Sequence, residues 1–279
     1  MTGAGGCPCC LSDRIVRWHR KGGHEILRCA ACGSGFLDPD TLPQETAALY
    51  TERYFKGDPR RTYADYRAER ENHRKAFQAA LRWLGSATPR GRLLEVGCAM
   101  GFFLEAAREA GWEVRGVEIS DYAARIAREE LGLDVLCADF TAPGTPLPEE
   151  RLEAVVALDV LEHLLRPRIF LEKARRALKD GGVALISTGQ ADSLSARLAG
   201  RRWRLLAPPE HVYYFSLPGL TALLNRHGFE VLGMRRFWKH YSLRAVLGAV
   251  GLNLPGPLSR IPIPVQAFDV MYVLARKTG

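Results

Sequence analysis

From residue 92 onward, short apolar runs alternate with amphipathic segments, and this pattern constrains the fold more than any other feature of the sequence. Short buried runs separated by helical patterns are typical of βαβ units, in which helices cover both faces of a parallel sheet. The predicted strands are 92–97, 113–118, 134–138, 154–158, 183–188, 229–237 and 268–275. The predicted helices are 102–110, 122–131, 169–178 and 217–228. Residues 179–182, which include two glycines, are expected to end the third of these helices. The sequence therefore predicts the α/β class, with a doubly wound and mostly parallel seven-stranded sheet.

The chain divides into three parts around this pattern. Residues 1–40 are rich in Gly and Cys and form a small N-terminal module, and residues 41–88 form a helical linker or lid region in two pieces. Residues 89–279 form the α/β domain. Within it, residues 238–264 are an insertion that is predicted to be helical at first and rich in proline later.

Composition and charge exclude several classes of protein. With 47% hydrophobic and 25% charged residues, the chain resembles a globular protein and not a disordered one. The longest mostly apolar stretch, 243–263, is interrupted by arginine, asparagine and proline, so no membrane span is expected. Residues 1–10 lack a basic start and an apolar core, so we expect no secretory signal and a cytoplasmic protein. The net charge of +8 permits an anionic substrate without requiring one.

A glycine-bearing turn follows the first predicted strand. Gly97 and Gly101 flank it, and small residues there let the backbone approach a ligand closely at the start of the next helix. Acids follow three further strands, at Glu118, Asp139 and Asp159. Glu118 can accept both hydroxyls of a ribose, and Asp139 can accept from the amine of an adenine. Because ligands of such sheets bind outside the carboxyl ends of the strands, these positions are expected to converge on one crevice.

The motifs resemble those of the class I S-adenosylmethionine-dependent methyltransferases, and in particular the type 23 methyltransferase domain. In that family's first motif, acid-x-G-x-G-x-G, Glu95, Gly97 and Gly101 match and Ala99 replaces the middle glycine. The resemblance extends to D-V-L-E-H-L at 159–164, L-K-D-G-G at 178–182 and P-P-E-H-V-Y-Y-F-S at 208–216. Many members also carry an N-terminal ribbon with paired cysteines. The longer G-x-G-x-x-G loop of dinucleotide dehydrogenases is absent after the first strand, which disfavours a nicotinamide enzyme.

The resemblance implies a Rossmann-like methyltransferase fold that binds S-adenosylmethionine. Its expected cofactor contacts lie in the glycine turn and after the next three strands. They are Glu95, Gly97, Cys98, Ala99, Gly101, Glu118, Ile119, Asp139, Phe140 and Asp159. The resemblance also implies a small-molecule acceptor, such as a sugar, a nucleotide-linked sugar or a specialised metabolite, methylated at oxygen or carbon.

Methyl transfer is an in-line displacement that needs a positioned acceptor and, for a hydroxyl or an acidic carbon, a general base. His163 and His211 are the candidate bases, and the sequence does not decide between them. Glu162 and Tyr214 are candidates for orienting the base or the acceptor. The arginines around position 203 suit an anionic substrate, although a solvated basic helix end explains them equally well. They are Arg197, Arg201, Arg202 and Arg204.

Two C-x-x-C pairs mark the N-terminal module. Cys7 and Cys10 form the first pair, Cys29 and Cys32 form the second, and 18 residues separate the pairs. This spacing is typical of a zinc site, with Cys9 as a less favourable substitute for Cys10. Four thiolates leave no open coordination position, so a zinc ion here is expected to be structural.

Two other functions stay open at this point. An RNA methyltransferase would use the ribbon for recognition and would carry a continuous basic face. Against it, positive and negative charges nearly balance in residues 1–40, so a dedicated grip on phosphates is not expected. A non-catalytic adaptor would carry the ribbon beside a decayed cofactor site, with Ala99 as its only support. The acceptor atom and the oligomeric state are left undecided.

Overall fold

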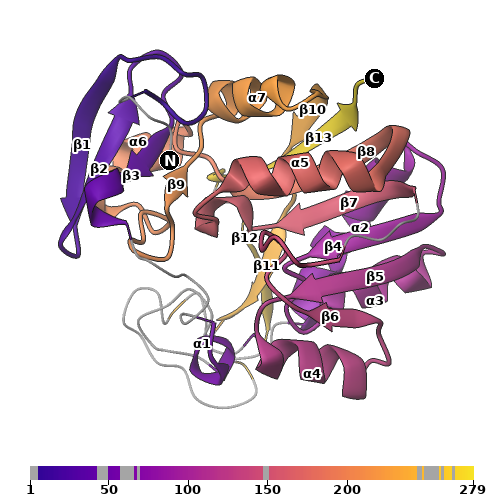
Figure 1. Cartoon of the computed structure of the whole chain (residues 1–279). Helices are drawn as coiled ribbons and strands as arrows, with labels where there is room; N and C mark the ends of the chain where they lie inside the picture. The colour runs from indigo at the N-terminus through magenta and orange to yellow at the C-terminus, as the bar shows by residue number, and fades with distance from the viewer. Residues whose placement is uncertain are drawn as a thin grey trace. The chain divides into compact units, whose positions relative to one another are not determined.

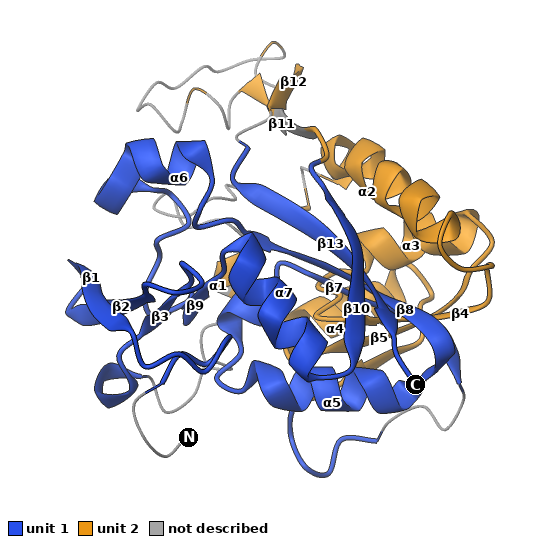
Figure 2. Cartoon of the chain, turned by 90° about the horizontal axis from the view of Figure 1, so that it is seen from above, with its two compact units in different colours: residues 1–46, 141–236, 268–279 blue, residues 47–140, 237–267 orange. Residues whose placement is uncertain are grey.

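The structure is a computed structural model that describes residues 6–42, 50–56, 66–67, 70–146, 151–243, 247, 258, 261–265 and 268–279. The chain forms two compact units, which Figure 2 distinguishes by colour. Unit 1 contains residues 1–46, 141–236 and 268–279, and unit 2 contains residues 47–140 and 237–267. The seven strands of the central sheet follow the order β10-β13-β8-β7-β4-β5-β6, which confirms the predicted α/β class and strand number. Across the described residues, no helix is both long and apolar enough to cross a membrane.

Unit 2 carries three parallel strands of this sheet. β4 (Arg92–Val96) pairs with β5 (Glu113–Glu118), which pairs with β6 (Val135–Cys137). The connections are α3 (Phe102–Glu109) and α4 (Asp121–Glu129), each with one buried apolar face. Because the three strands are parallel, the turns that follow them lie at the same edge of the sheet.

Two further helices and a hairpin complete unit 2. α1 (Glu52–Lys56) contacts α4, and α2 (Arg70–Gly85) packs against α3. Leu243 and Leu247 are helical, as expected early in the insertion, but the residues before them form β11 (Lys239–Ser242), a strand that pairs with β12 (Pro262–Val265). Local periodicity could not show this, since the pairing partner lies at the other end of the insertion.

Unit 1 carries the other four strands. β7 (Leu152–Leu158) runs parallel to β8 (Leu178–Gly189), and β13 (Val270–Lys277) pairs antiparallel with β8 and with β10 (Phe229–Arg235). α5 (Pro167–Ala177) connects β7 to β8, and α7 (Leu217–Arg226) precedes β10 (Figure 1). α5 ends within one residue of the predicted end at 178, and residues 179–182 form the first part of β8, where the register with β7 shifts and Gly181 has a φ of +73°.

The N-terminal module forms a four-stranded antiparallel sheet with a strand from a distant part of unit 1. β1 (Ile15–Lys21), β2 (His24–Cys29) and β3 (Gly35–Leu37) follow one another, and β3 then pairs with β9 (Tyr213–Tyr214). Figure 1 shows these four strands side by side. The module is therefore part of unit 1 and not an appendage on a linker.

Candidate active site

The turn after β4 has the backbone of a glycine loop. Gly97, Ala99 and Gly101 have φ values of +71°, +49° and +81°. Residues with a Cβ adopt this left-handed region at a cost of about 1–2 kcal/mol, so Ala99 occupies a position that favours glycine. The turn ends at Gly101, which is the N-cap residue of α3. The sequence motif thus has the conformation that its glycines predict.

Close packing adds a second requirement at Gly101. A Cβ there would lie 2.4 Å from Cδ1 of Leu133 and 3.1 Å from Cβ of Ala127. A similar contact occurs at Gly116 in β5, where a Cβ would lie 2.7 Å from Sγ of Cys98. Gly116 was not among the predicted site residues, since a lone glycine inside a strand carries no distinctive signal.

Glu118 fastens this turn to the end of β5. Its Oε2 accepts a hydrogen bond from the N–H of Ala99 at 2.8 Å, and its Oε1 accepts one from the N–H of Ser120 at 2.8 Å. The carboxylate is 5% exposed. Burial raises the pKa of Glu118 above its ordinary value, against the opposing effect of the N–H donors. Both oxygens have further lone pairs with which to accept hydroxyl groups.

Glu95 is a second buried acid close to the turn. It is 3% exposed, and among the described residues its Oε2 has no hydrogen-bond partner. Burial and the nearby charge of Glu118 raise its pKa well above the ordinary value. Burial and the charges of Glu95 and Glu118 likewise raise the pKa of the Cys98 thiol, so Cys98 is an inert buried residue.

The remaining predicted residues of unit 2 follow β5 and β6. Ile119 is half-buried, Asp139 is exposed and Phe140 is 4% exposed. Gly97, Glu118 and Asp139 thus follow three parallel strands at one edge of the sheet. Asp159 belongs to unit 1 and is described with it below.

Aromatic side chains from the helical region pack on the glycine turn. Phe55 of α1 forms a buried cluster with Met100 and Phe102, and Ala99 packs against that cluster. The ring of Tyr66 stacks on Phe102 with a centroid separation of 5.4 Å. The sequence indicated these aromatic residues as apolar helix positions, but it gave no sign that they cover the turn.

In unit 1, Asp159 follows β7 in a strained conformation, with a φ of +54°. Its N–H donates to the main-chain oxygen of Ser187 at 3.0 Å, and the Ser187 hydroxyl donates to its Oδ1 at 2.7 Å. Ser187 is fully buried in β8. The neighbouring strand therefore fixes both the backbone and the carboxylate of Asp159.

The two candidate histidines lie against each other. The ring centroids of His163 and His211 are 4.6 Å apart, at an interplanar angle of 84°. Nδ1 of His163 is 2.9 Å from the main-chain oxygen of Glu210, and Nδ1 of His211 is 2.7 Å from that of Leu205. Carbonyl oxygens only accept, so each Nδ1 carries a proton and each neutral ring has its lone pair on Nε2.

Burial favours the neutral form of both imidazoles. It lowers the pKa of His163 below its ordinary value. Burial, aided by the neighbouring His163, lowers the pKa of His211 to about 3. This lowered pKa makes His211 a weak proton acceptor, whereas a neutral ring can still bind an electrophile through its lone pair.

Glu162 and Tyr214 differ in their relation to this pair. Glu162 is 4% exposed, and its side chain comes together with those of both histidines. Tyr214 lies in an apolar cluster with Trp203, its ring centroid is 6.4 Å from that of His211, and no described residue bonds to its hydroxyl. Tyr214 therefore packs beside the pair, whereas Glu162 joins it.

The arginines near Trp203 separate into two kinds. Arg204 lies 2.8 Å from Oδ1 of Asp269, and the other oxygen of Asp269 accepts from the Trp203 indole at 3.0 Å. Arg197, Arg201 and Arg202 are exposed, on and after α6 (Leu194–Ala199). Arg204 thus has a structural partner, and the exposed arginines provide positive surface charge.

The cysteines of the N-terminal module form one compact group. Sγ of Cys7 is 3.6 Å from Sγ of Cys32, and Sγ of Cys10 is 3.6 Å from Sγ of Cys29. All four sulfur atoms lie within 4.8 Å of one another. A tetrahedron with Zn–S bonds of about 2.3 Å has edges of about 3.8 Å, so the spacing fits a zinc ion. Cys9 is not part of the group.

Hydrogen bonds join the cysteine module to the segment that contains His211. Gly35 and Phe36 pair with Tyr214 and Tyr213 between β3 and β9. The Ser216 hydroxyl donates to the main-chain oxygen of Cys32 at 2.6 Å. The strand that follows His211 is thus held by the module.

Comparisons with known proteins agree with this geometry. A family model described as a methyltransferase domain matches residues 66–233. Ubiquinone biosynthesis O-methyltransferase of Cereibacter sphaeroides is 28% identical over 130 residues, which cover 45% of this chain and 53% of that protein. The protein of the same name from Ruegeria pomeroyi is 32% identical over 155 residues, which cover 52% of this chain and 62% of that protein. The chain therefore spans little more than half the length of these relatives.

A solved structure shows the same fold. The crystal structure of magnesium protoporphyrin IX methyltransferase from Synechocystis PCC 6803 with bound SAH matches with a TM-score of 0.52 and 15% identity. The match covers 76% of this chain and 86% of that chain. At this identity the likeness concerns the fold alone.

Proposed function

The chain belongs to the family of S-adenosylmethionine-dependent methyltransferases, and from this membership we propose that it methylates a small-molecule acceptor at a hydroxyl oxygen or an acidic carbon. The observation that carries the proposal is the glycine turn, in which the left-handed backbone at 97–101 is fastened to the carboxylate of Glu118. The same arrangement argues against a decayed cofactor site, because Ala99 retains the φ that a glycine would have.

We assign the cofactor to the edge of the sheet at the glycine turn. Glu118 would accept the ribose hydroxyls through the lone pairs that the two N–H groups leave open. The buried Glu95 has an oxygen without a partner among the described residues, which suits the ammonium group of the cofactor. Cys98, Ala99 and the start of α3 would contribute main-chain groups. The other assigned contacts within unit 2 are Gly97, Gly101, Ile119, Asp139 and Phe140.

When bound, S-adenosylmethionine supplies a methyl group on a positively charged sulfur. An acceptor can attack the methyl carbon by in-line displacement of the sulfur. The residues of the chain must then hold the acceptor and remove its proton. His163 and His211 are the candidate residues for this task, because each Nδ1 faces a main-chain oxygen and each lone pair lies on Nε2. The pKa of about 3 makes His211 the weaker candidate as a proton acceptor. Glu162 would orient the pair, and the exposed arginines suit an anionic acceptor.

We assign a structural zinc ion to Cys7, Cys10, Cys29 and Cys32. The sulfur separations of 3.6 Å support this assignment. Such an ion would support the strand beside His211 and would take no part in the chemistry.

The relatives named as O-methyltransferases of ubiquinone biosynthesis support oxygen as the acceptor atom and a small molecule as the acceptor. The test uses S-adenosylmethionine with a labelled methyl group and a cell extract separated into RNA, protein and small-molecule fractions. We expect the label in the small-molecule fraction. Mild acid should not release the labelled methyl group from the product. Label in RNA would contradict the proposed acceptor class and assign the ribbon to RNA recognition. A chain that fails to bind S-adenosylmethionine would contradict the proposed function as a whole.

A further inference from the structure

Glu162, His163 and His211 form a second group of side chains that can hold a metal ion, distinct from the four cysteines. Glu162 and His163 end the short helix η3 (Leu161–His163) after β7, and His211 lies two residues before β9. One ligand atom from each side chain lies within 4.8 Å of the other two. Two imidazoles and a carboxylate are a donor set suited to Zn²⁺, Mn²⁺ and Fe²⁺. The group thus has the composition of a cation site.

Main-chain oxygens hold both imidazoles in the manner of metal ligands. A ligating histidine normally donates its second ring N–H to a carbonyl or a carboxylate, which fixes its tautomer and orientation. Here Nδ1 of His163 and Nδ1 of His211 each lie within 3 Å of a main-chain oxygen, at 2.9 and 2.7 Å. With the proton on Nδ1, each ring has its lone pair on Nε2, the nitrogen through which it would bind a cation.

The two segments that carry the ligands are also tied to each other. The N–H of Val212 donates to the main-chain oxygen of Glu162 at 2.7 Å, and the N–H of His211 donates to that of Ala207 at 2.9 Å. The ligands are thus brought together by backbone contacts.

We propose that Glu162, His163 and His211 bind one divalent cation, which activates a hydroxyl of the methyl acceptor. Three protein ligands leave coordination positions open, whereas the four thiolates of the cysteine group leave none. A hydroxyl that occupies an open position becomes more acidic. This inference rests on the proposed function and narrows its acceptor to small molecules whose hydroxyl can bind a cation, such as phenols and vicinal diols.

The reaction balances without a histidine base. The acceptor hydroxyl releases its proton to solvent, its oxygen forms a bond to the methyl carbon, and the carbon–sulfur bond breaks with its electron pair staying on sulfur. The products are a methyl ether, S-adenosylhomocysteine and a proton. The two histidines then act together as ligands.

The test measures cation binding by the full-length chain after its four cysteines have been saturated with one equivalent of Zn²⁺ per chain, so that no zinc is left for the second group. Mn²⁺ is the probe, because thiolate sites select softer metals and its electron paramagnetic resonance signal separates bound from free ion. We expect one bound Mn²⁺ per chain. The variants His163→Asn, His211→Asn and Glu162→Gln should each lower its affinity by more than about tenfold. Asparagine can retain the hydrogen bond made by Nδ1–H while it removes Nε2.

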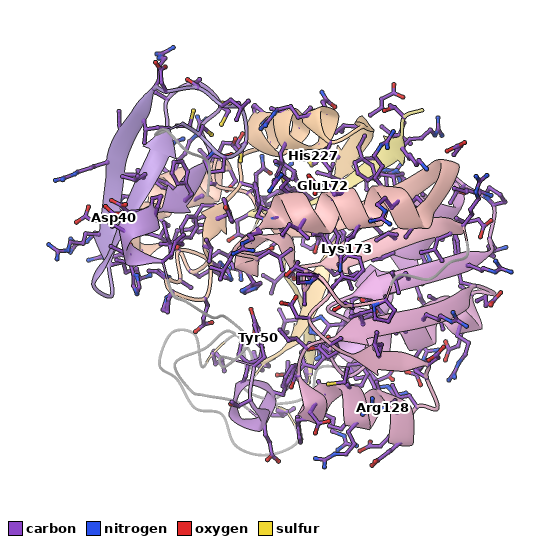
Figure 3. The ribbon with its side chains drawn as sticks, in the orientation of Figure 1. Asp40, Tyr50, Arg128, Glu172, Lys173 and His227 are labelled. Atoms are coloured by element: carbon purple, nitrogen blue, oxygen red, sulfur yellow. The ribbon has the colours of Figure 1, made fainter. Side chains whose placement is uncertain are left out.

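A matched control uses the same residue types outside the group. Glu172 of α5 and His227 after α7, both labelled in Figure 3, are replaced as Glu172→Gln and His227→Asn. Glu172 pairs with Arg168 at 3.5 Å, and neither control residue belongs to a metal-competent group among the described residues. Both control variants should keep the affinity for Mn²⁺. Thermal unfolding and the binding of S-adenosylhomocysteine show whether each variant is folded.

Pulsed electron paramagnetic resonance of the Mn²⁺-loaded wild-type chain needs no variant. Couplings from two imidazole nitrogens are expected, and a spectrum without nitrogen coupling would overturn the site. A zinc-saturated chain that binds no Mn²⁺, or folded variants that bind it as well as the wild type does, would also overturn it. Methyl transfer that persists without a second cation would support the proposed function but contradict the role of the cation in it. Bound Mn²⁺ without any methyl transfer would support the cation site but contradict the proposed function.

Discussion

The glycine turn at 97–101 and the histidine group of Glu162, His163 and His211 are held in place by different means. The turn is made of main-chain conformation within one βαβ unit, and Glu118 is the side chain that fastens it. In the histidine group, His163 is oriented by a main-chain oxygen of a remote segment, at Glu210, and His211 is oriented by a main-chain oxygen of that same segment, at Leu205. That segment continues into a strand paired with the cysteine module. The comparison teaches that cofactor binding and turnover should be separable by mutation.

The largest effect is expected from a single methyl group in the turn. Gly101→Ala places a Cβ 2.4 Å from Leu133 at a φ of +81° and should destabilise the chain by roughly 2–4 kcal/mol. Affinity for S-adenosylmethionine should fall more than about tenfold in calorimetry, while the zinc content is unchanged. Gly85→Ala is the control, because nothing lies within 4 Å of a Cβ there. Equal effects of the two substitutions would show that the turn is not built as described.

A substitution in the cysteine module should affect the histidine group and not the glycine turn. Cys32→Ser weakens the proposed zinc site and the attachment of β3 to β9, so turnover should fall about tenfold while affinity for S-adenosylmethionine changes little. Steady-state kinetics and calorimetry on the same preparation check both values. Cys137→Ser, outside the module, should change neither. A parallel loss of cofactor affinity in Cys32→Ser would break the separation between the two regions.

A smaller effect is expected from the side chain that fastens the turn. Glu118→Gln removes a charged acceptor from two N–H groups and from the proposed ribose contact, which costs about 1.5 kcal/mol or about tenfold in affinity. Turnover at saturating S-adenosylmethionine should change less. Glu113→Gln at the exposed start of the same strand is the control. Calorimetry that finds unchanged affinity in Glu118→Gln would exclude the ribose role.

The smallest effect is expected on stability, at the junction between the cysteine module and the segment that follows β9. Ser216→Ala removes the N-cap of α7 and the side-chain hydrogen bonds to Cys32 and Ser34 of the module. Ser193→Ala removes the N-cap of α6 and a local hydrogen bond to Ser195. Each cap is worth about 1 kcal/mol, and the bond to Cys32 should add about 1 kcal/mol to the loss in Ser216→Ala. Unfolding in denaturant measures the difference. Equal losses would mean that the junction contributes nothing to stability.

The sheet was predictable because its signal is local. Apolar runs that follow helical patterns identify all seven strands to within a few residues. Two strands extend beyond the predictions. β8 begins at Leu178, before the predicted start at 183, and β11 precedes the helical residues of the insertion and pairs with β12. In both places the competing influence was a strand from elsewhere in the chain.

The candidate site was predictable to different depths. Glu118 and the glycines could be located because each follows a strand, and parallel strands bring their ends to one edge. The cover formed by Phe55 and the close contact at Gly116 could not be predicted, because they depend on packing and not on motif. The role of Ser216 was hidden for the same reason, since its partner Cys32 is distant in sequence.

The sequence by itself determined the glycine turn and the two C-x-x-C motifs of the cysteine module. The conformational preference of glycine and the spacing of metal ligands each act over a few residues. Only the tertiary structure decided that Glu162, His163 and His211 form one group and that the cysteine module supports the strand beside it. His163 and its acceptor Glu210 are 47 positions apart in the chain. Hydrogen bonds between such segments form only when the core brings their backbones together, so no local pattern records them.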